Sequence, residues 1–88
     1  MQSQTGSTVS VRVLLFGSYA ESLGLDAVEL VLDKPATVAS AVDHLRALPQ
    51  GERLPPRPLC ALNLTQTRMD AALSSGDELA VLPPLAGG

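Results

Sequence analysis

The sequence TVASAVDHLRAL (residues 37–48) decides the fold, because it carries the main helical pattern of the chain. Apolar side chains recur in it three and four residues apart and would line one face of an α-helix. Thr37 stands where a side chain can cap the helix N-terminus, and Pro49 ends the pattern. We expect one amphipathic helix near Thr37–Leu48, with these core-facing residues: Val38, Ala41, Val42, Leu45 and Leu48.

Two strands and a short helix are predicted before this main helix. A strand begins at Val9, where apolar and polar residues alternate, and a second alternating run covers residues 28–33. Between them, Ser18 and Glu21 have the spacing of a capping box, and Gly24 supplies a C-terminal stop. This segment therefore predicts a helix of one or two turns that starts at Ser18.

The segment after the main helix predicts two further strands. Four prolines and a glycine make residues 49–58 an irregular surface loop. Residues 59–64 predict a well-buried strand, and residues 78–82 predict the last strand. Residues 65–73 are ambiguous and could form a short strand plus a turn.

The order of these elements predicts an α+β fold, a mixed sheet with one main helix packed on one face. A ubiquitin-like β-grasp has this arrangement. A ferredoxin-like split βαβ fold is the alternative, but it needs two full-length helices, and residues 17–24 make a poor one. We expect a flexible tail over residues 1–8, a β-grasp domain over residues 9–82 and an extended C-terminal tail over residues 83–88.

The composition excludes several classes of function. The chain has 88 residues, a net charge of −3 and only two aromatic residues, Phe16 and Tyr19, so it has little with which to bind nucleic acid. No apolar run approaches the length of a membrane-spanning helix. Cys60 is the single cysteine and His44 the single histidine, which argues against a disulfide scaffold or a zinc site and favours a reducing cytoplasm. We expect no metal and no cofactor bound by this chain.

The end of the chain carries the chemistry. The last predicted strand leads directly into Pro83 and Pro84, which cannot extend a sheet ladder and favour an extended conformation. Six residues can then reach roughly 20 Å from the domain. Gly87 and Gly88 lack Cβ atoms, so the terminal carboxylate could enter a narrow active site of another protein. A carboxylate becomes reactive once it is adenylated, and its carbonyl can then accept sulfur or an amine.

The stretches GDELA (residues 76–80) and PPLAGG (residues 83–88) together resemble the C-terminal signature of a known family. This family is the small, sulfur-carrier subunit of molybdopterin synthase. Its first strand, short helix and middle strand resemble further positions of this chain: residues 11–17, Glu21, Gly24, Leu62 and Asn63. The chain departs from the family where Leu82 replaces a common aromatic residue, where Ala20 replaces a common arginine, and at Leu85 and Ala86 before the diglycine.

The resemblance implies a carrier that is not an enzyme alone. An enzyme similar to the ubiquitin E1 class would use ATP to adenylate Gly88, and a sulfur donor would convert it to a thiocarboxylate, with Gly87 clearing its path. The carrier would then dock on a large synthase subunit, usually as a heterotetramer, and donate sulfur to a pyranopterin precursor of the molybdenum cofactor.

The predicted partner-binding residues surround the start of the tail: Phe16, Leu82, Pro83, Pro84, Leu85 and Ala86. Phe16 is open to two interpretations, because it could face a partner or simply cover the short helix. Three other functions remain open: sulfur supply to thiamine or another pathway, a ubiquitin-like modifier, and a non-reactive interaction module. Cys60 lies in an apolar strand, so core packing is favoured over a sulfur relay.

Overall fold

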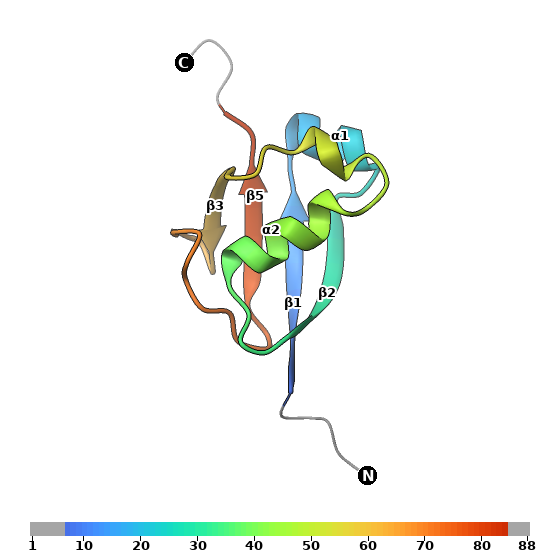
Figure 1. Ribbon diagram of the computed structural model, residues 1–88. Helices are drawn as coiled ribbons and strands as arrows, with labels where there is room; N and C mark the ends of the chain where they lie inside the picture. The colour runs from blue at the N-terminus through green and yellow to red at the C-terminus, as the bar shows by residue number, and fades with distance from the viewer. Residues whose placement is uncertain (1–6, 85–88) are drawn as a thin grey trace.

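The structure is a computed structural model that describes residues 7–84. Five strands form one mixed sheet in the order β2-β1-β5-β3-β4, and the helices lie on one side of it (Figure 1). The strands are β1 (Thr8–Leu15), β2 (Ala27–Asp33), β3 (Leu59–Leu62), β4 (Thr65–Gln66) and β5 (Glu78–Leu82). The helices are α1 (Gly17–Leu23), α2 (Val38–Arg46) and a short 3₁₀ turn, η1 (Gly51–Arg53). The predicted α+β architecture, with one main helix on one face of a mixed sheet, is confirmed.

The first and last strands lie side by side in the middle of the sheet. β1 and β5 pair in parallel, with Leu15 opposite Val81, whereas β1–β2, β3–β5 and β3–β4 pair antiparallel. β1 begins at Thr8, one residue before the predicted domain boundary, because Thr8 pairs with Asp33 of β2. The parallel pair places the end of β5 beside the turn into α1.

Strand alternation explains the core. In β1 every second residue from Val9 to Leu15 is buried, and in β5 Leu79 and Val81 are buried in the same way. These side chains face α2, which buries four of its nine residues against them: Val38, Ala41, Val42 and Leu45. The apolar stripe predicted from the sequence therefore forms the helix side of the core, apart from Leu48, which lies beyond the helix and is half-buried.

The capping of α2 is confirmed, and its end differs slightly from the prediction. Thr37 Oγ1 accepts a hydrogen bond from the Ser40 amide at 3.2 Å, and Ser40 Oγ accepts one from the Thr37 amide at 2.8 Å. The helix ends at Arg46, two residues before Leu48. The amide of Leu48 instead donates to the Leu45 carbonyl, which is the tighter hydrogen bond of a 3₁₀ turn.

The predicted capping box of the short helix is wrong. α1 begins at Gly17, so Ser18 already lies inside the helix, and the N-cap is Phe16, with no capping side chain. Gly17 has a φ of +55°, which lets the chain turn into a helix directly after β1. The predicted C-terminal stop is confirmed, since Gly24 adopts a φ of +71°.

The third strand is shorter and more exposed than predicted. β3 ends at Leu62, and Asn63 and Leu64 form a turn instead of continuing the strand. Cys60 is buried, but Leu59 is 48% exposed and Leu64 is 92% exposed. The prediction of a well-buried strand fails because β3 lies near the edge of the sheet, next to the two-residue β4, and none of the helices among residues 7–84 covers the other face of the sheet.

None of the helices within residues 7–84 has the length and the apolar character needed to cross a membrane.

Candidate docking face and the start of the C-terminal tail

The chain leaves the sheet at the end of β5. Leu82 is the last paired residue, opposite Leu59 of β3, and Pro83 and Pro84 follow outside any strand. Pro83 is half-buried and Pro84 is exposed, so the chain enters solvent between them. The predicted site residues Leu85, Ala86, Gly87 and Gly88 lie outside the described residues.

Pro83 packs against the turn that begins α1. A Cβ atom added at Gly17 would lie 3.1 Å from Cγ of Pro83, which is closer than an ordinary van der Waals contact. Sequence reasoning singled out Pro83 but missed Gly17, because their contact depends on the parallel pairing of the two terminal strands. Gly17 thus leaves room for the proline that begins the tail.

The sheet face away from α2, here called the open face, is apolar where the tail begins. The strand pairings place Leu82 beside Leu59, and Ala80 between Leu14 and Ala61. Phe16 follows Leu15, the partner of Val81, and therefore lies level with Leu82; it is 44% exposed. We call this set the docking face: Leu14, Phe16, Leu59, Ala61, Ala80 and Leu82.

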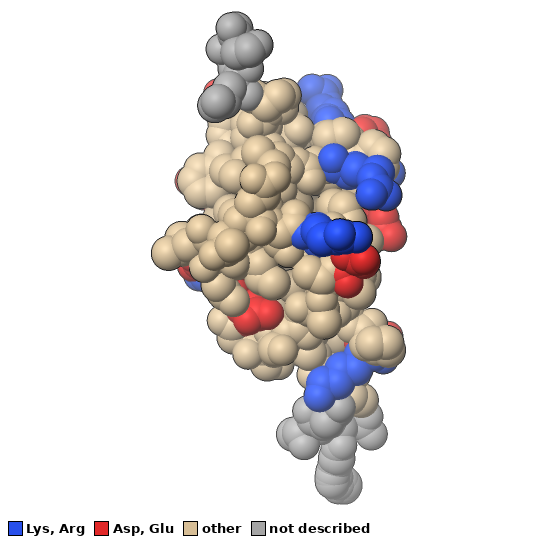
Figure 2. Space-filling model, turned by 90° about the vertical axis from the view of Figure 1, so that its left-hand side faces the viewer, with Lys and Arg blue, Asp and Glu red and all other residues tan. Residues whose placement is uncertain are grey.

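Two predicted partner-binding residues, Phe16 and Leu82, are thus brought together beside Pro83. Leu59 and Leu14 were missed by sequence reasoning. Alternation around the buried Cys60 would have placed Leu59 on the opposite face, but the sequence did not say that this face is open. Figure 2 shows a largely uncharged surface directly below the C-terminal end, with the blue side chains gathered on one side of the molecule.

Charged side chains occupy the other end of the open face. Arg12 of β1 lies between Glu29 of β2 and Glu78 of β5 in the strand register. Glu29 also accepts a hydrogen bond from Ser10 Oγ at 3.2 Å. The open face therefore combines an apolar surface next to the tail with a mixed-charge surface far from it, which is typical of a protein interface with a polar rim.

The single thiol is part of the core. Cys60 is 2% exposed, and burial raises the pKa of its thiol to about 11, so it stays protonated at neutral pH. Its Sγ–H donates to the Pro58 carbonyl at 3.6 Å. Burial, and to a lesser extent the nearby Cys60, also raises the pKa of Tyr19. A covered, protonated thiol is a poor nucleophile, which agrees with the packing role predicted for Cys60.

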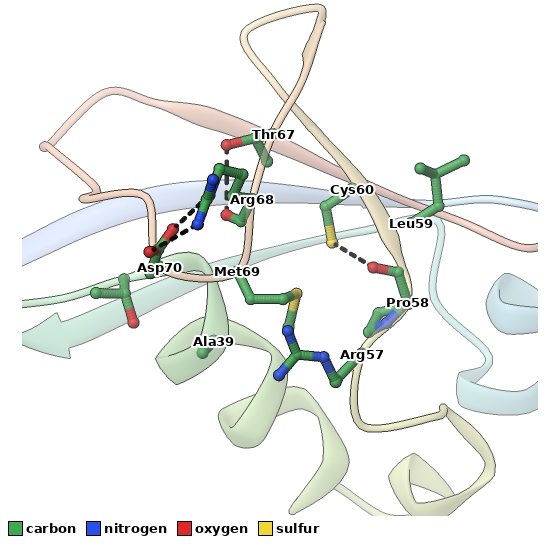
Figure 3. Close-up of a pocket in the computed structure, with 10 residues that line it drawn as sticks. Ala39, Arg57, Pro58, Leu59, Cys60, Thr67, Arg68, Met69 and Asp70 are labelled. Carbon is green, nitrogen blue, oxygen red and sulfur yellow. Dashed lines mark hydrogen bonds and ion pairs between the residues drawn. The ribbon is translucent and has the colours of Figure 1, made fainter.

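An open hollow of about 800 Å³ lies between β3, residues 67–70 and α2 (Figure 3). Cys60, Met69 and Ala39 line it, and the Arg68–Asp70 ion pair, at 3.2 Å, belongs to its rim. Both partners of that ion pair are exposed by more than 70%. No cluster of three or more histidine, cysteine or carboxylate side chains suited to a metal occurs among residues 7–84.

Comparison with known proteins agrees with this geometry. The model of the ThiS family matches residues 13–88. The molybdopterin synthase sulfur carrier subunit of Escherichia coli is 36% identical over 83 residues, which cover 89% of this chain and 99% of that protein.

Solved structures share the fold. SAMP1 (small archaeal modifier protein 1) of Haloferax volcanii superposes with a TM-score of 0.78 and 31% identity, covering 90% of this chain and 99% of that one. A chain from the complex of subunits 1 and 2 of the Helicobacter pylori molybdopterin-converting factor also matches, with a TM-score of 0.65 and 21% identity. The match covers 91% of this chain and 100% of that one, and it shows the fold alone. These neighbours confirm the ubiquitin-like β-grasp, and the chain belongs to the ThiS family, among the relatives of the molybdopterin synthase sulfur carrier subunits.

Proposed function

We propose that this chain is a sulfur carrier for molybdopterin synthesis, and that its C-terminal Gly88 holds the sulfur as a thiocarboxylate. The observation that carries this proposal is the position of the chain exit. β5 ends at Leu82, which lies at the apolar end of the open face, and the two prolines that follow lie outside the sheet. A partner bound to the docking face would have the tail directly in front of it.

The chemistry at Gly88 requires two steps. The carboxylate attacks the α-phosphorus of ATP in an activating enzyme of the E1 type, which releases pyrophosphate and forms an acyl-adenylate. A sulfide equivalent from a sulfur donor then attacks the carbonyl carbon, and AMP leaves. We propose that ATP is bound by the activating partner and not by this chain.

The carrier then delivers its sulfur within a second complex. The Helicobacter pylori neighbour was solved as a complex of subunits 1 and 2 of a molybdopterin-converting factor. By analogy, we propose that this chain docks on a large synthase subunit, in a heterotetramer built on two large subunits. Gly87 would pass the narrow entrance, because it has no side chain, and Gly88 would present its sulfur to the pyranopterin precursor.

Docking is assigned to the residues around the chain exit. Leu82 and Phe16 of the docking face would bind both partners, and Pro83 and Pro84 would hold the tail in an extended conformation. Leu85 and Ala86 would line the entrance of the partner's active site. We place this cycle in the cytoplasm, where reducing conditions keep a thiocarboxylate intact.

The proposal is tested by changing the end of the chain and measuring sulfur transfer with a purified activating enzyme, sulfur donor and large subunit. Deleting Gly88 should abolish product formation, since the remaining end stops about 3.5 Å short of the catalytic groups. One added C-terminal residue should do the same, because it places the reacting carbonyl inside a peptide bond. Normal product formation by either variant would contradict the proposal.

A second candidate function is favoured by the 31% identity to SAMP1 of Haloferax volcanii. The name of that protein, small archaeal modifier protein 1, calls it a modifier. The same acyl-adenylate would then react with a lysine amine of a target protein and form an isopeptide bond. Lys34 is the single lysine of this chain, so chains of modifiers would have one internal attachment site. Adducts whose mass equals a target plus this chain, less one water, would identify this function.

A further inference from the structure

The hairpin between β3 and β4 has an unusual pair of residues at its tip. Asn63 and Leu64 connect the paired residues Leu62 and Thr65, and their φ angles are +50° and +75°. A two-residue hairpin turn with both central residues at positive φ favours Asn followed by Gly. Asparagine suits the first position, but a leucine in the left-handed region is strained, because its Cβ comes too close to the following carbonyl oxygen. Leu64 therefore stands where glycine would be more stable.

Leu64 is also the most exposed large apolar side chain in the part of the chain that the structure describes. Its exposed fraction is 92%, against 61% for Val31 and 48% for Leu59. The position thus carries two unfavourable features, backbone strain and an apolar side chain in water. Strain of this kind concentrates at functional positions.

Asn63 holds the tip in place. Its Nδ2 donates to Asp77 Oδ1 at 3.0 Å, and its Oδ1 accepts from the Glu78 amide at 2.9 Å. Its own amide donates to the Glu78 carbonyl at 2.8 Å. These three hydrogen bonds attach the tip to the start of β5, so Leu64 is presented on a rigid support. A backbone that is already fixed loses little conformational entropy when its side chain binds a partner.

From this geometry we infer that Leu64 is a preformed apolar anchor that inserts into an apolar pocket of a protein partner. The partner is the large synthase subunit, so the inference rests on the function proposed above. β3 runs from Leu59, in the docking face, to the tip, and this places Leu64 on the same continuous element as the docking face. Four residues of strand span about 14 Å, which fits within an interface of ordinary size, about 800 Å² on each partner.

The charge around the tip favours a protein as the partner over a membrane or a nucleic acid. Residues 58–67 contain no charged side chain, and the two residues that hold Asn63 in place, Asp77 and Glu78, are acidic. Anionic lipid headgroups and phosphates are held by clustered lysine and arginine, which this hairpin lacks. A single neutral leucine on a rigid turn instead suits a concave apolar pocket, the usual receptor for an interface anchor.

The test is the variant Leu64→Gly, measured in two ways. Because it creates the Asn-Gly pair that this turn favours, the thermal unfolding temperature should stay the same or rise. Affinity for the purified large subunit, measured by calorimetry, should fall about tenfold or more, as expected when a buried leucine side chain is lost. Thr65→Ala, on the same hairpin, is the control and should leave the affinity unchanged.

The two measurements separate an anchor from a structural residue. A residue that only maintains the hairpin would lose affinity and stability together, and that result would overturn the inference. So would an unchanged affinity in Leu64→Gly. Leu82→Asp is measured alongside: if it weakens binding while Leu64→Gly does not, the proposed function stands and the anchor fails. If the unmodified chain itself does not bind the large subunit, both fail.

Discussion

Gly17 and Pro83 lie so close that a Cβ atom on Gly17 would be 3.1 Å from Cγ of the proline. The two residues lie 66 positions apart in the sequence, and the parallel pairing of β1 with β5 brings them together (Figure 1). The turn into α1 thus supports the first residue of the tail. We expect this contact to set the direction in which the tail leaves the domain.

The variant Gly17→Ala should slow the modification of Gly88. Its new methyl group would push Pro83 outward by a few tenths of an ångström, and even small displacements of a positioned group reduce the rate of its reaction. An alanine at this positive φ would also cost about 1–2 kcal/mol of folding free energy. Initial rates of adenylation, measured by pyrophosphate release with the activating enzyme, would show the effect.

Gly24→Ala is the matched control for that experiment. Gly24 has a similar φ, +71°, but a Cβ atom there would meet nothing within 4 Å. Both variants should lose similar stability in chemical denaturation, whereas only Gly17→Ala should slow adenylation. Equal rates in the two variants would show that the contact with Pro83 has no role in positioning the tail.

Leu59→Lys should weaken binding to the large subunit without unfolding the chain. Leu59 is half exposed beside Leu82, so a lysine there can reach water in the free protein, but its charge would be desolvated in the complex. The loss of affinity should be about tenfold or more. Val31→Lys, on the edge strand β2 and 61% exposed, is the control and should bind normally. Equal affinities for both variants would exclude Leu59 from the interface.

The buried thiol should make stability depend on pH in the alkaline range. Burial raises the pKa of Cys60 from 9.0 to about 11, so between these values the unfolded chain loses the proton while the folded chain keeps it. The free energy of unfolding should be unaffected by this group below pH 9 and should fall between pH 9 and pH 11, by up to about 1.4 kcal/mol per pH unit.

Cys60→Ala should show a flatter decline over the same range. The raised pKa of Tyr19 comes mainly from burial, so the tyrosine contributes to both curves, and the difference between them reports the thiol together with its smaller effect on Tyr19. Urea unfolding at pH 8, 9, 10 and 11 measures the difference. Parallel curves for the two proteins would mean that the thiol titrates alike in the folded and unfolded states.

Local patterns in the sequence predict the parts of the fold that depend on neighbouring residues. The cap at Thr37 and the alternation in β1 and β5 are of this kind, and all three appear in the structure. The start of α1 could not be read from the spacing of Ser18 and Glu21, because the backbone of Gly17 decides where that helix begins.

The candidate site also has a part that local sequence patterns predict and a part that depends on the whole fold. The prolines and the diglycine are visible in the sequence, but the docking face depends on which side of the sheet has no helix over it. That property is not local, so Leu59 was taken for a core residue. The exposed position of Leu64 could not be predicted at all, since no sequence pattern indicates that a leucine will adopt a left-handed backbone conformation.

The central claim is that Gly88 carries sulfur, and the intact mass of the chain tests it most directly. After incubation with ATP, a purified activating enzyme and a sulfur donor, the chain should gain about 16 Da, the difference between sulfur and oxygen in the two forms of its end. Fragmentation should locate the gain at Gly88, and addition of the large subunit with the pyranopterin precursor should reverse it. A chain whose mass stays unchanged, while a known carrier gains sulfur in the same mixture, would contradict the account.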